Sequence, residues 1–311
     1  MIRKHIKRIV SNIPAVRHLL AIRQELKQLD GIAQSLRRIT QSLEPHLRYD
    51  LMLRQEAYLA DLMRSPRYSQ KSRLLWAEQQ VFSQHGEDGI LREIFHRIGE
   101  TDRSFVEIGV GNGLENNTTY LLLKGWSGLW VDGNAKDLAY ARREFRQVIE
   151  AGRLRIIESF VSRLNIVSTL NEANIPAEFD LLSLDIDRNT WFVWEALGHL
   201  RPRVVVVEYN PAFPPGDEWC VDDQPEASWN ASIYFGASLK SWEILGNKLG
   251  YHLVGCDTTG TNAFFVRADL TQDRFCEPFA AENHYEPPRY FLNRYHSFPH
   301  RRKFSDTDPL Q

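Results

Sequence analysis

Cysteine is scarce in this chain of 311 residues, with three in all, at Cys220, Cys256 and Cys276. They are widely separated and form no C-x-x-C pair, which argues against a disulfide framework and against a cysteine-rich zinc site. Long apolar runs are missing too, since none approaches the roughly 18 residues of a transmembrane helix. Pro14 and Arg17 interrupt the apolar stretch after the basic start, so a signal peptide is not expected. These absences favour a reducing, cytoplasmic location.

An excess of charge of one sign is also missing, because 38 Lys and Arg balance 40 Asp and Glu. The hydrophobic fraction of 43% and the charged fraction of 25% are typical of a soluble globular protein. The length suits one large domain, or one domain with an appendage. We expect a helical extension over residues 1–72 and a single larger domain over residues 73–311.

Residues 1–17 mix basic and apolar side chains, so that a helix there has one basic and one apolar face. This pattern is typical of a segment that lies on an anionic membrane surface, and it predicts peripheral membrane contact through residues 1–17. An amphipathic helix without membrane contact is the other interpretation.

Apolar side chains then repeat every seven residues, at Ile22, Leu29, Leu36 and Leu43. The repeat predicts a short coiled coil and therefore a homo-oligomer that forms through residues 19–43. An intramolecular helical hairpin with residues 51–64 is the alternative, and it would bury the same face. Either way, the segment serves assembly or placement rather than chemistry.

The stretch from Ser104 to Gly133 has the order strand, glycine-rich turn, helix, strand, acid. The glycines are Gly109, Gly111 and Gly113, and the second strand ends at Asp132, about 20 residues beyond the turn. Glycines let a ligand approach the backbone, and a carboxylate in this position accepts hydrogen bonds from ribose hydroxyls. The stretch therefore predicts a nucleoside site. A turn without a ligand is the alternative, because any tight turn favours glycine.

The spacing of these glycines, G-x-G-x-G, differs from the G-x-G-x-x-G of dinucleotide-binding proteins. The sequence has no G-x-x-x-x-G-K-[ST] run either, so a P-loop nucleotidase is not expected.

Helical and strand patterns alternate beyond Asp132. Strands are expected over residues 154–157, 179–186 and 203–209, and helices over residues 135–150, 163–173 and 190–200. The alternation predicts right-handed crossovers and a doubly wound parallel sheet with helices on both faces. Residues 251–255 and 262–267 predict a closing hairpin. The long proline-rich, acidic stretch over residues 211–230 is expected to be a functional loop.

Polar side chains follow the carboxyl ends of the predicted strands, where open parallel sheets bind their ligands. Asp185, Asp187, Glu208 and Asn210 come after the fourth and fifth strands and form an oxygen-only set, the kind that Mg²⁺ prefers. A metal-free site in which one acid acts as general base is the alternative. The negative charge of this sheet edge would repel the phosphate backbone of a nucleic acid. No nucleic-acid partner is therefore expected.

The strand order with its antiparallel last strand, the motif VEIGVGNG (residues 106–113) and Asp132 resemble the class I S-adenosylmethionine-dependent methyltransferases. More narrowly, FSQHGEDGIL (residues 82–91) and LSLDID (residues 182–187) resemble the FkbM-like methyltransferases, which O-methylate sugars and polyketide-type metabolites. The resemblance covers about residues 81–267. FkbM-like proteins often read D-V-E-G after the fourth strand, whereas this chain has Arg188 in place of that glycine. The acidic pair is also similar to that of the metal-assisted sugar O-methyltransferases of the TylF type.

The resemblance implies a Rossmann-like, seven-stranded, doubly wound α/β methyltransferase sheet that is mostly parallel, with the last strand antiparallel. It implies an O-methyltransferase that uses S-adenosylmethionine, acts on a hydroxyl of a sugar, glycan or glycosylated metabolite, and is metal-assisted where Mg²⁺ or another divalent cation binds. The expected cofactor-binding residues are Gln84, Glu107, Gly109, Gly111, Asn112, Gly113, Asn117, Asp132, Gly133, Ser159, Phe160 and Asp185. The base is expected to be Asp187 or His85, with Glu208 positioning the substrate, and the metal ligands are expected to be Asp185, Asp187 and Glu208.

Two other functional classes compete with a methyltransferase. An NAD-dependent oxidoreductase would use the same kind of sheet, although the glycine spacing disfavours it. A non-catalytic, methyltransferase-like scaffold in a surface-glycan assembly complex would use the coiled coil for placement. Binding of S-adenosylmethionine or of NAD separates the first two classes, and methyl transfer separates both from the scaffold.

Overall fold

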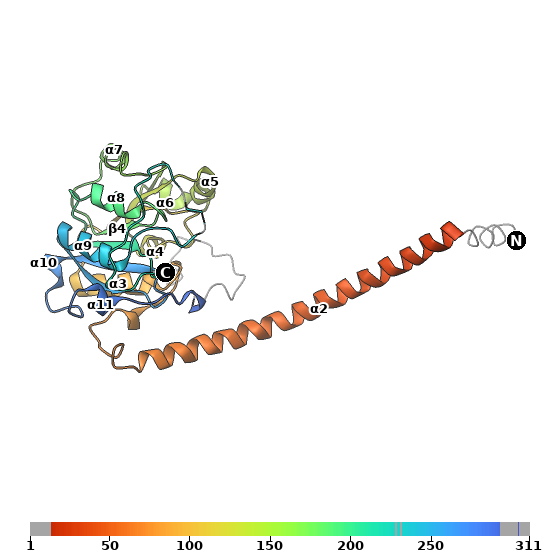
Figure 1. Cartoon of the computed structure of the whole chain (residues 1–311). Coiled ribbons are helices and arrows are strands. Elements are labelled where there is room, and N and C mark those ends of the chain that lie inside the picture. Colours follow the sequence, from red (N-terminus) through yellow and green to blue (C-terminus); the bar gives the residue numbers. More distant parts are fainter. Residues whose placement is uncertain (1–13, 228, 231, 293–303, 305–311) are drawn as a thin grey trace. The chain divides into compact units, whose positions relative to one another are not determined.

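The computed structural model describes residues 14–227, 229–230, 232–292 and 304. Contacts between residues divide the chain into two units, Met1–Ala57 and Tyr58–Gln311, and each is described by itself. Figure 1 labels the α-helices and strand β4. Most of the basic, apolar segment over residues 1–17 lies outside the described residues, so its membrane contact stays a prediction. No helix in the described part of the chain has an apolar stretch that would span a bilayer.

Helix α2 (Pro14–Met63) is a single helix of 50 residues. It contains both the heptad segment and most of residues 51–64, so the alternative of a helical hairpin between these segments is wrong. A hairpin requires the chain to reverse between residues 43 and 51, and the backbone there is helical throughout, including at Pro45. The Leu and Ile side chains of the seven-residue repeat are exposed.

Seven strands form one sheet. Across the sheet they are β3 (Leu154–Glu158), β2 (Ser127–Asp132), β1 (Ser104–Ile108), β4 (Leu181–Leu184), β5 (Val204–Glu208), β7 (Asn262–Arg267) and β6 (Tyr251–Cys256). The pairs among β1 to β5 are parallel, whereas β7 is antiparallel to both of its neighbours. This arrangement confirms the predicted fold class, including the antiparallel last strand. The order switches direction between β1 and β4, where an open sheet of this kind binds its ligands.

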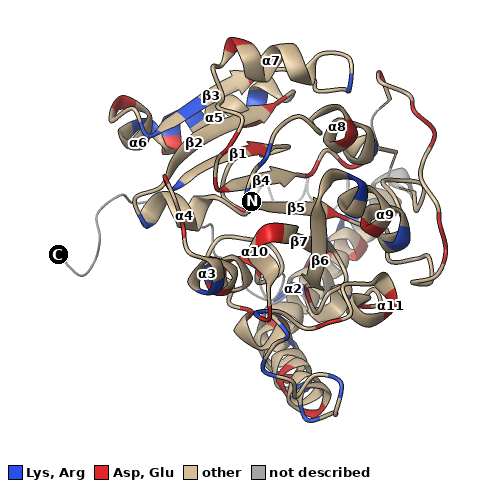
Figure 2. Cartoon of the chain, turned by 90° about the vertical axis from the view of Figure 1, so that its left-hand side faces the viewer, with Lys and Arg blue, Asp and Glu red and all other residues tan. Residues whose placement is uncertain are grey.

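Helices cover both faces of this sheet (Figure 2). One face packs against α3 (Glu87–Ile98), α4 (Thr119–Leu123), α5 (Ala135–Glu144) and α6 (Arg146–Glu150). The other face packs against α7 (Ile166–Glu172), α8 (Thr190–Ala196) and α9 (Leu239–Leu249). Side chains alternate between the two layers along each central strand, for example Phe105 and Val106 in β1. Because both faces are buried, the strands are almost continuously apolar, which is why the sequence pattern located them.

The helix expected over residues 135–150 is divided into α5 and α6 at Phe145. The Phe145 ring is fully buried and meets the Trp130 ring edge to face, with 4.7 Å between the ring centroids. Anchoring this ring in the core takes precedence over helix continuity. The side chain of Asn134 caps the start of α5 by accepting hydrogen bonds from the backbone N–H groups of Lys136 and Asp137.

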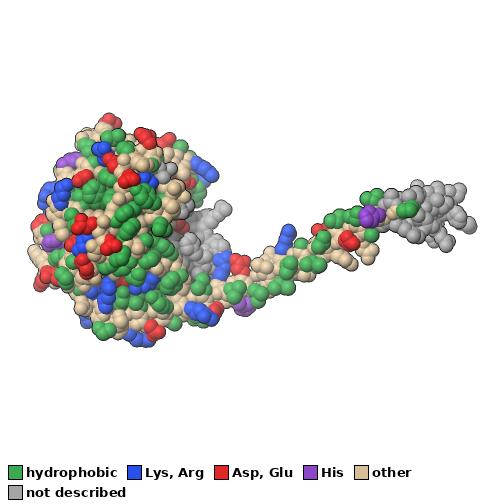
Figure 3. Space-filling model, in the orientation of Figure 1, with side chains coloured by type: hydrophobic (Ala, Val, Ile, Leu, Met, Phe, Trp, Pro, Cys, Tyr) green, Lys and Arg blue, Asp and Glu red, His purple; other side chains and the backbone are tan. Residues whose placement is uncertain are grey.

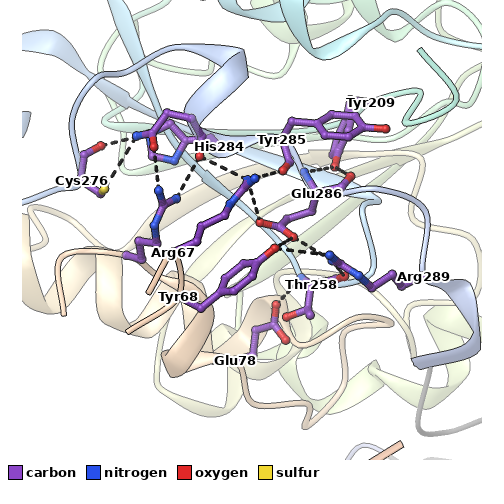
Figure 4. A network of polar contacts seen from close by, with 12 residues as sticks. Arg67, Tyr68, Glu78, Tyr209, Thr258, Cys276, His284, Tyr285, Glu286 and Arg289 are labelled. Carbon is purple, nitrogen blue, oxygen red and sulfur yellow. Dashed lines mark hydrogen bonds and ion pairs between the residues drawn. The ribbon is translucent and has the colours of Figure 1, made fainter. Parts of the chain in front are cut away.

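Short helices η1 (Leu75–Ala77), α10 (Ala268–Thr271), α11 (Ala281–His284) and η2 (Tyr290–Leu292) flank this layered core in sequence. A buried ion pair holds the segment around α11 and η2. Glu286 is fully buried and accepts hydrogen bonds from Arg289 Nη1 at 2.7 Å and from the Tyr68 hydroxyl at 2.8 Å. Arg67 lies 3.3 Å from the other oxygen of this carboxylate. Figure 4 shows the carboxylate between these side chains, which come from both ends of the globular unit's sequence. Burial raises the pKa of Glu286 against the opposing effect of Arg289.

Glu78 lies at the edge of the same network and accepts a hydrogen bond from the backbone N–H of Thr258. Desolvation by the surrounding protein, and then the nearby Asp257 carboxylate, raise the pKa of Glu78 to about 8. The carboxyl is therefore mostly protonated in the folded chain at neutral pH, although it would be ionised in the unfolded chain.

This shift predicts a pH-dependent effect of Glu78→Gln on stability. A folded-state pKa above the unfolded value of 4.5 contributes stability that is complete below pH 4.5 and is lost as pH rises through about 8. The amide mimics the neutral carboxyl and still accepts from Thr258. We therefore expect urea unfolding of the variant and the parent to coincide near pH 4.5 and the variant to become progressively the more stable up to pH 8. A constant difference between the two across this range would contradict the assignment.

Candidate functional site

The glycine-rich turn after β1 is forced by the close approach of two strand ends. Gly109 has a φ of +86°, and a Cβ atom there would lie 1.5 Å from the carbonyl oxygen of Asp185. The Asp185 N–H in turn donates to the carbonyl of Ile108 at 2.9 Å. A side chain at position 109 would force the ends of β1 and β4 apart. Glycine is therefore required at position 109 for the two strand ends to approach each other. The missing side chain also leaves the backbone of the turn open to a ligand.

Asp132 at the end of β2 ties the turn to the next loop. One carboxylate oxygen accepts the N–H of Gly111 at 2.8 Å, and the other accepts the N–H of Asn134 at 2.7 Å. A carboxylate has about four acceptor positions, so two remain for a ligand. Gly133 follows, and a Cβ there would lie 3.2 Å from the backbone of Phe160. The two hydrogen bonds hold the Asp132 carboxylate in place, and Phe160, which follows β3, lies beside Gly133.

A cavity of about 560 Å³, called the larger cavity below, opens over the ends of β1 to β4. Phe160, which is 52% exposed, and Trp229 of the long loop stand at its walls. The expected residues that line it are Gly109, Gly111, Asp132, Gly133, Ser159, Phe160, Asp185 and Asp187. Sequence reasoning did not single out Asn134, Asn189 or Trp229 for this cavity. The sequence did contain an indication for Trp229, because this residue belongs to the loop over residues 211–230 that was predicted to be functional.

A second cavity of about 260 Å³, the smaller cavity, lies on the other side of the glycine turn. The expected residues that line it are Gln84, Glu107, Gly109, Gly111, Asn112, Asn117 and Asp185. Glu87, Glu115, Asn116, Asp137 and Asn262 line it as well and were not predicted as site residues. Asn262 had no local signal, because it reaches the site through the pairing of β7 with Glu208 of β5.

The linings of both cavities are acidic. Five carboxylates surround the smaller cavity, and Asp132 and Asp187 add two more in the larger one. Among the described residues that line either cavity there is no Lys, Arg or His. Burial raises the pKa values of Glu87 and Glu107, and at Glu87 this rise prevails over the opposing effect of His85. Such a lining attracts a positively charged ligand and repels a phosphate.

Glu107 lines the smaller cavity and also holds neighbouring residues of its wall in place. Its buried carboxylate accepts hydrogen bonds from the N–H groups of Asn117 at 2.9 Å and Thr118 at 3.2 Å, and from the Asn116 amide at 3.2 Å. These bonds fix the turn that precedes α4. Glu107 therefore positions Asn116 and Asn117 at the cavity as well as facing it.

Gly113, the third glycine of the turn, lines neither cavity. It has a φ of +83°, and a Cβ there would lie 2.6 Å from the Trp130 ring and 2.8 Å from the Phe145 ring. The atoms nearest to that Cβ position belong to these two core aromatic rings. The sequence placed Gly113 among the cofactor-binding residues, whereas its surroundings indicate that it permits close packing beneath the turn.

Three carboxylates converge where β4 and β5 end. Asp185, Asp187 and Glu208 each offer an oxygen, and these oxygens lie within 4.8 Å of one another. Desolvation by the cleft walls and the neighbouring Asp187 carboxylate raise the pKa of Asp185 to about 7. Desolvation, and then Asp132, raise the pKa of Asp187, and burial and then Asp185 raise that of Glu208 well above its usual range. The arrangement matches the expected metal ligands in residue type and proximity.

Asp187 has a φ of 58°, in the left-handed region that few residues other than glycine, Asn and Asp adopt. The backbone N–H of the next residue, Arg188, donates to the carbonyl oxygen of Ile186 at 2.7 Å. This tight turn presents Asp187 to the open cleft, where its side chain is exposed. Backbone strain of this kind is often found at functional sites.

Two expected polar residues lie apart from this cluster. His85 lines a small third cavity with Glu78, Gln84 and Thr258, and its backbone N–H donates to Glu87 at 2.7 Å. His85 is a minor influence that opposes the rise in the pKa of Asp185, which burial and then Asp187 dominate. The Asn210 amide donates to the carbonyls of Ile233 and Phe235, so it anchors the end of the long loop. Of the two expected bases, Asp187 is the one that lines the larger cavity.

Comparison with solved structures finds proteins of similar shape. The N-terminal domain of EvdMO1 with SAH bound has 15% identity and a TM-score of 0.39, over 61% of this chain and 81% of that chain. A putative caffeoyl-CoA O-methyltransferase from Staphylococcus aureus has 15% identity and a TM-score of 0.42, over 69% and 99%. A putative O-methyltransferase from Klebsiella pneumoniae has 13% identity and a TM-score of 0.39, over 67% and 93%.

No protein-family model matches the chain, and no curated protein matches it. Likenesses to solved structures at this level do not identify a reaction. The functional argument therefore rests on the site itself.

Proposed function

We propose that this protein is an S-adenosylmethionine-dependent O-methyltransferase. The adenosine of the cofactor occupies the larger cavity, where Asp132 accepts hydrogen bonds from the ribose hydroxyls and Phe160 lies against the base. The methionine end occupies the smaller cavity. Gly109, Gly111 and Asp185 line both cavities, so the sulfonium lies beside these three residues. That junction also borders the three converging carboxylates.

The observation that carries this proposal is the charge of the lining. S-adenosylmethionine has a positive sulfonium and a positive ammonium, whereas NAD has a negatively charged pyrophosphate. Carboxylates without a Lys, Arg or His among the described lining residues favour the first and disfavour the second. A phosphate-binding turn would instead direct N–H groups and cations at its ligand. The same lining argues against the dinucleotide alternative independently of glycine spacing.

The reaction proposed is an in-line displacement, in which a substrate hydroxyl oxygen forms a bond to the methyl carbon and the bond from sulfur to that carbon breaks. The sulfonium is already an activated electrophile, so the protein has to align the oxygen and remove its proton. Asp187 takes that proton, because its carboxylate faces the cleft and its raised pKa makes it a better base near neutral pH. Asp185 and Glu208, the other two carboxylates of the cluster, orient the substrate that accepts the methyl group.

Asp185, Asp187 and Glu208 also fit Mg²⁺ or another divalent cation, since all three are oxygen donors that reach one point. A cation bound there would lower the pKa of a coordinated hydroxyl. The proposal therefore includes a divalent cation that these three carboxylates would bind.

The proposed acceptor is a hydroxyl of a sugar, glycan or glycosylated metabolite. The FkbM-like motifs at residues 82–91 and 182–187 suggest this class. Trp229 and Tyr234, which are exposed side chains near the end of the long loop, add physical support, because aromatic rings offer both an apolar face and a polar edge to a sugar.

Calorimetry and a transfer assay test the proposal together. We expect the full chain to bind S-adenosylmethionine and to show no binding of NAD under the same conditions. With labelled cofactor, we expect methyl transfer to at least one member of a panel of sugars, nucleotide sugars and lipid-linked glycans, and a loss of that transfer when a chelator is added. Binding of NAD alone would overturn the proposal. Transfer unaffected by chelator would remove the cation and leave Asp187 as the base.

Asp132→Ala should weaken the binding of S-adenosylmethionine by about 10- to 100-fold. A hydrogen bond to a charged group is worth about 1.5–3 kcal/mol, and this variant removes the ribose acceptor together with the support of Gly111. Calorimetry gives the dissociation constant. Glu158→Ala is the matched control, because this acid ends the neighbouring strand β3 but lines neither cavity. Equal affinity in Asp132→Ala and the parent would contradict the placement of the ribose.

A further inference from the structure

The apolar stripe of α2 has no use in the proposed reaction and needs a partner. The Leu and Ile side chains at positions 19, 22, 26, 29, 32, 36, 39, 43 and 47 are 40–68% exposed. A helix gains most of its stability from packing such a face rather than from helix propensity. We propose that α2 pairs with α2 of a second copy in an antiparallel coiled coil in which residue i lies level with residue 69 − i.

The seam has the heptad order in which a positions are 19, 26, 33, 40 and 47 and d positions are 22, 29, 36 and 43. Two a positions, Ala33 and Thr40, are small. In the antiparallel arrangement Ala33 faces Leu36 of the partner helix, and Thr40 faces Leu29 of the partner helix. Every central layer then contains at least one Leu. A parallel pair in register would instead stack Ala33 on Ala33 and Thr40 on Thr40, leaving two poorly filled layers.

The flanking charges select the same arrangement and register. In an antiparallel pair the e positions of the two helices face each other along one side of the seam. Seam residues in one layer sum to 69, and the facing e positions, which lie between neighbouring layers, sum to 67. Arg23 therefore faces Glu44 of the partner helix, and Asp30 faces Arg37 of the partner helix. By symmetry each contact occurs twice, so all four e-position pairs have opposite charges. Glu44 also pairs with Arg48 on its own helix, and a carboxylate can accept from both.

Other arrangements bring like charges together. A shift by one heptad in either direction places Asp30 opposite Asp30 or Arg37 opposite Arg37 of the partner helix. A parallel pair in register places Glu25 beside Asp30 of the partner helix. Like-charge contacts of this kind are the means by which natural coiled coils exclude wrong partners and registers.

The other side of the seam is apolar at its centre. Ile32 and Ile39 are g positions. Facing g positions sum to 71 in the proposed register, so Ile32 lies against Ile39 of the partner helix, and this contact occurs twice. These residues widen the stripe where Ala33 and Thr40 narrow it. Figure 3 shows hydrophobic side chains along α2. The two irregularities of the heptad repeat, small a positions and apolar g positions, therefore have one explanation in this pairing.

Thiol cross-linking in the full chain tests the orientation. The native cysteines lie outside α2, and the unmodified chain serves as the control for them. Ile22 and Leu47 are level in the proposed pair, so a mixture of Ile22→Cys and Leu47→Cys chains should form a mixed disulfide dimer under mild oxidation. Ile22→Cys alone should not, because its two thiols would lie about 37 Å apart, at 1.5 Å per residue. Efficient self-cross-linking of Ile22→Cys would overturn the proposal in favour of a parallel pair.

Charge reversal tests the register. Sedimentation equilibrium should show the parent as a dimer and Arg23→Glu as a dimer about tenfold weaker, because two attractive contacts become repulsive. Arg23→Glu/Glu44→Arg should restore the parental dissociation constant. Arg23→Glu/Glu25→Arg has the same net charge as the parent and should not restore it. A parent that stays monomeric, or a double variant at positions 23 and 44 without recovery, would overturn the pairing. The inference does not depend on the proposed reaction.

Discussion

Asp187→Asn is expected to lower the rate constant of methyl transfer by about a thousandfold. The amide cannot accept the proton of the substrate hydroxyl, and removal of a positioned base typically costs between about 10² and 10⁴ in rate. Asn is the appropriate replacement, because the position has a φ of 58° and Asn tolerates the left-handed region almost as well as Asp. Single-turnover transfer of a labelled methyl group measures the effect on the chemical step.

Affinity for S-adenosylmethionine should change by less than about threefold in Asp187→Asn, since the ribose is assigned to Asp132. Asp217→Asn is the matched control, because it replaces an exposed acid of the long loop that lines neither cavity. That control should retain parental rate and affinity. A variant at Asp187 that keeps more than a tenth of the parental rate would assign proton removal to another group.

Glu286→Ala is expected to lower the free energy of unfolding by about 3–5 kcal/mol. The substitution leaves the Arg289 guanidinium, which is 8% exposed, without its carboxylate partner. An unpaired charge in a buried place costs far more than the pair itself contributes. The Tyr68 hydroxyl loses its acceptor as well. Urea unfolding followed by tryptophan fluorescence reports on the globular unit.

Two further variants separate this effect from simple loss of an ion pair. Glu282→Ala removes a carboxylate that pairs with Lys240 at 2.8 Å but is half exposed, so its cost should stay below about 1 kcal/mol. Glu286→Leu/Arg289→Met removes both buried charges and should recover much of the stability lost in Glu286→Ala. If Glu286→Ala costs no more than Glu282→Ala, the buried pair does not hold the C-terminal segment in the way described.

Most of the sheet could be predicted from the sequence, because its signal is local. Central strands buried on both faces must be apolar along their length, and the helices between them must keep one apolar face. The closing hairpin of β6 and β7 was predicted for the same reason. Element ends were less predictable. The break at Phe145 depends on a pocket beside Trp130, and nothing near position 145 in the sequence reports that pocket.

The candidate site was predictable in part. Residues just after the strands, such as Asp132 and Asp185, were found because the carboxyl ends of parallel strands share one edge of the sheet. Gly113 was grouped with Gly109 and Gly111 by spacing, although its surroundings are the Trp130 and Phe145 rings. Spacing alone does not tell whether a glycine makes room for a ligand or for a neighbouring side chain.

The sequence by itself determined which segments are strands and helices, which strand ends carry acids, and which face of α2 is apolar, because each of these follows from the period of side chains along one element. The tertiary structure alone decided that Asp185, Asp187 and Glu208 bring their oxygens within 4.8 Å, while His85 lines a separate cavity. It also decided that Tyr68 meets Glu286 across 218 residues. Contacts of that kind depend on how finished elements pack together, and no local pattern records them.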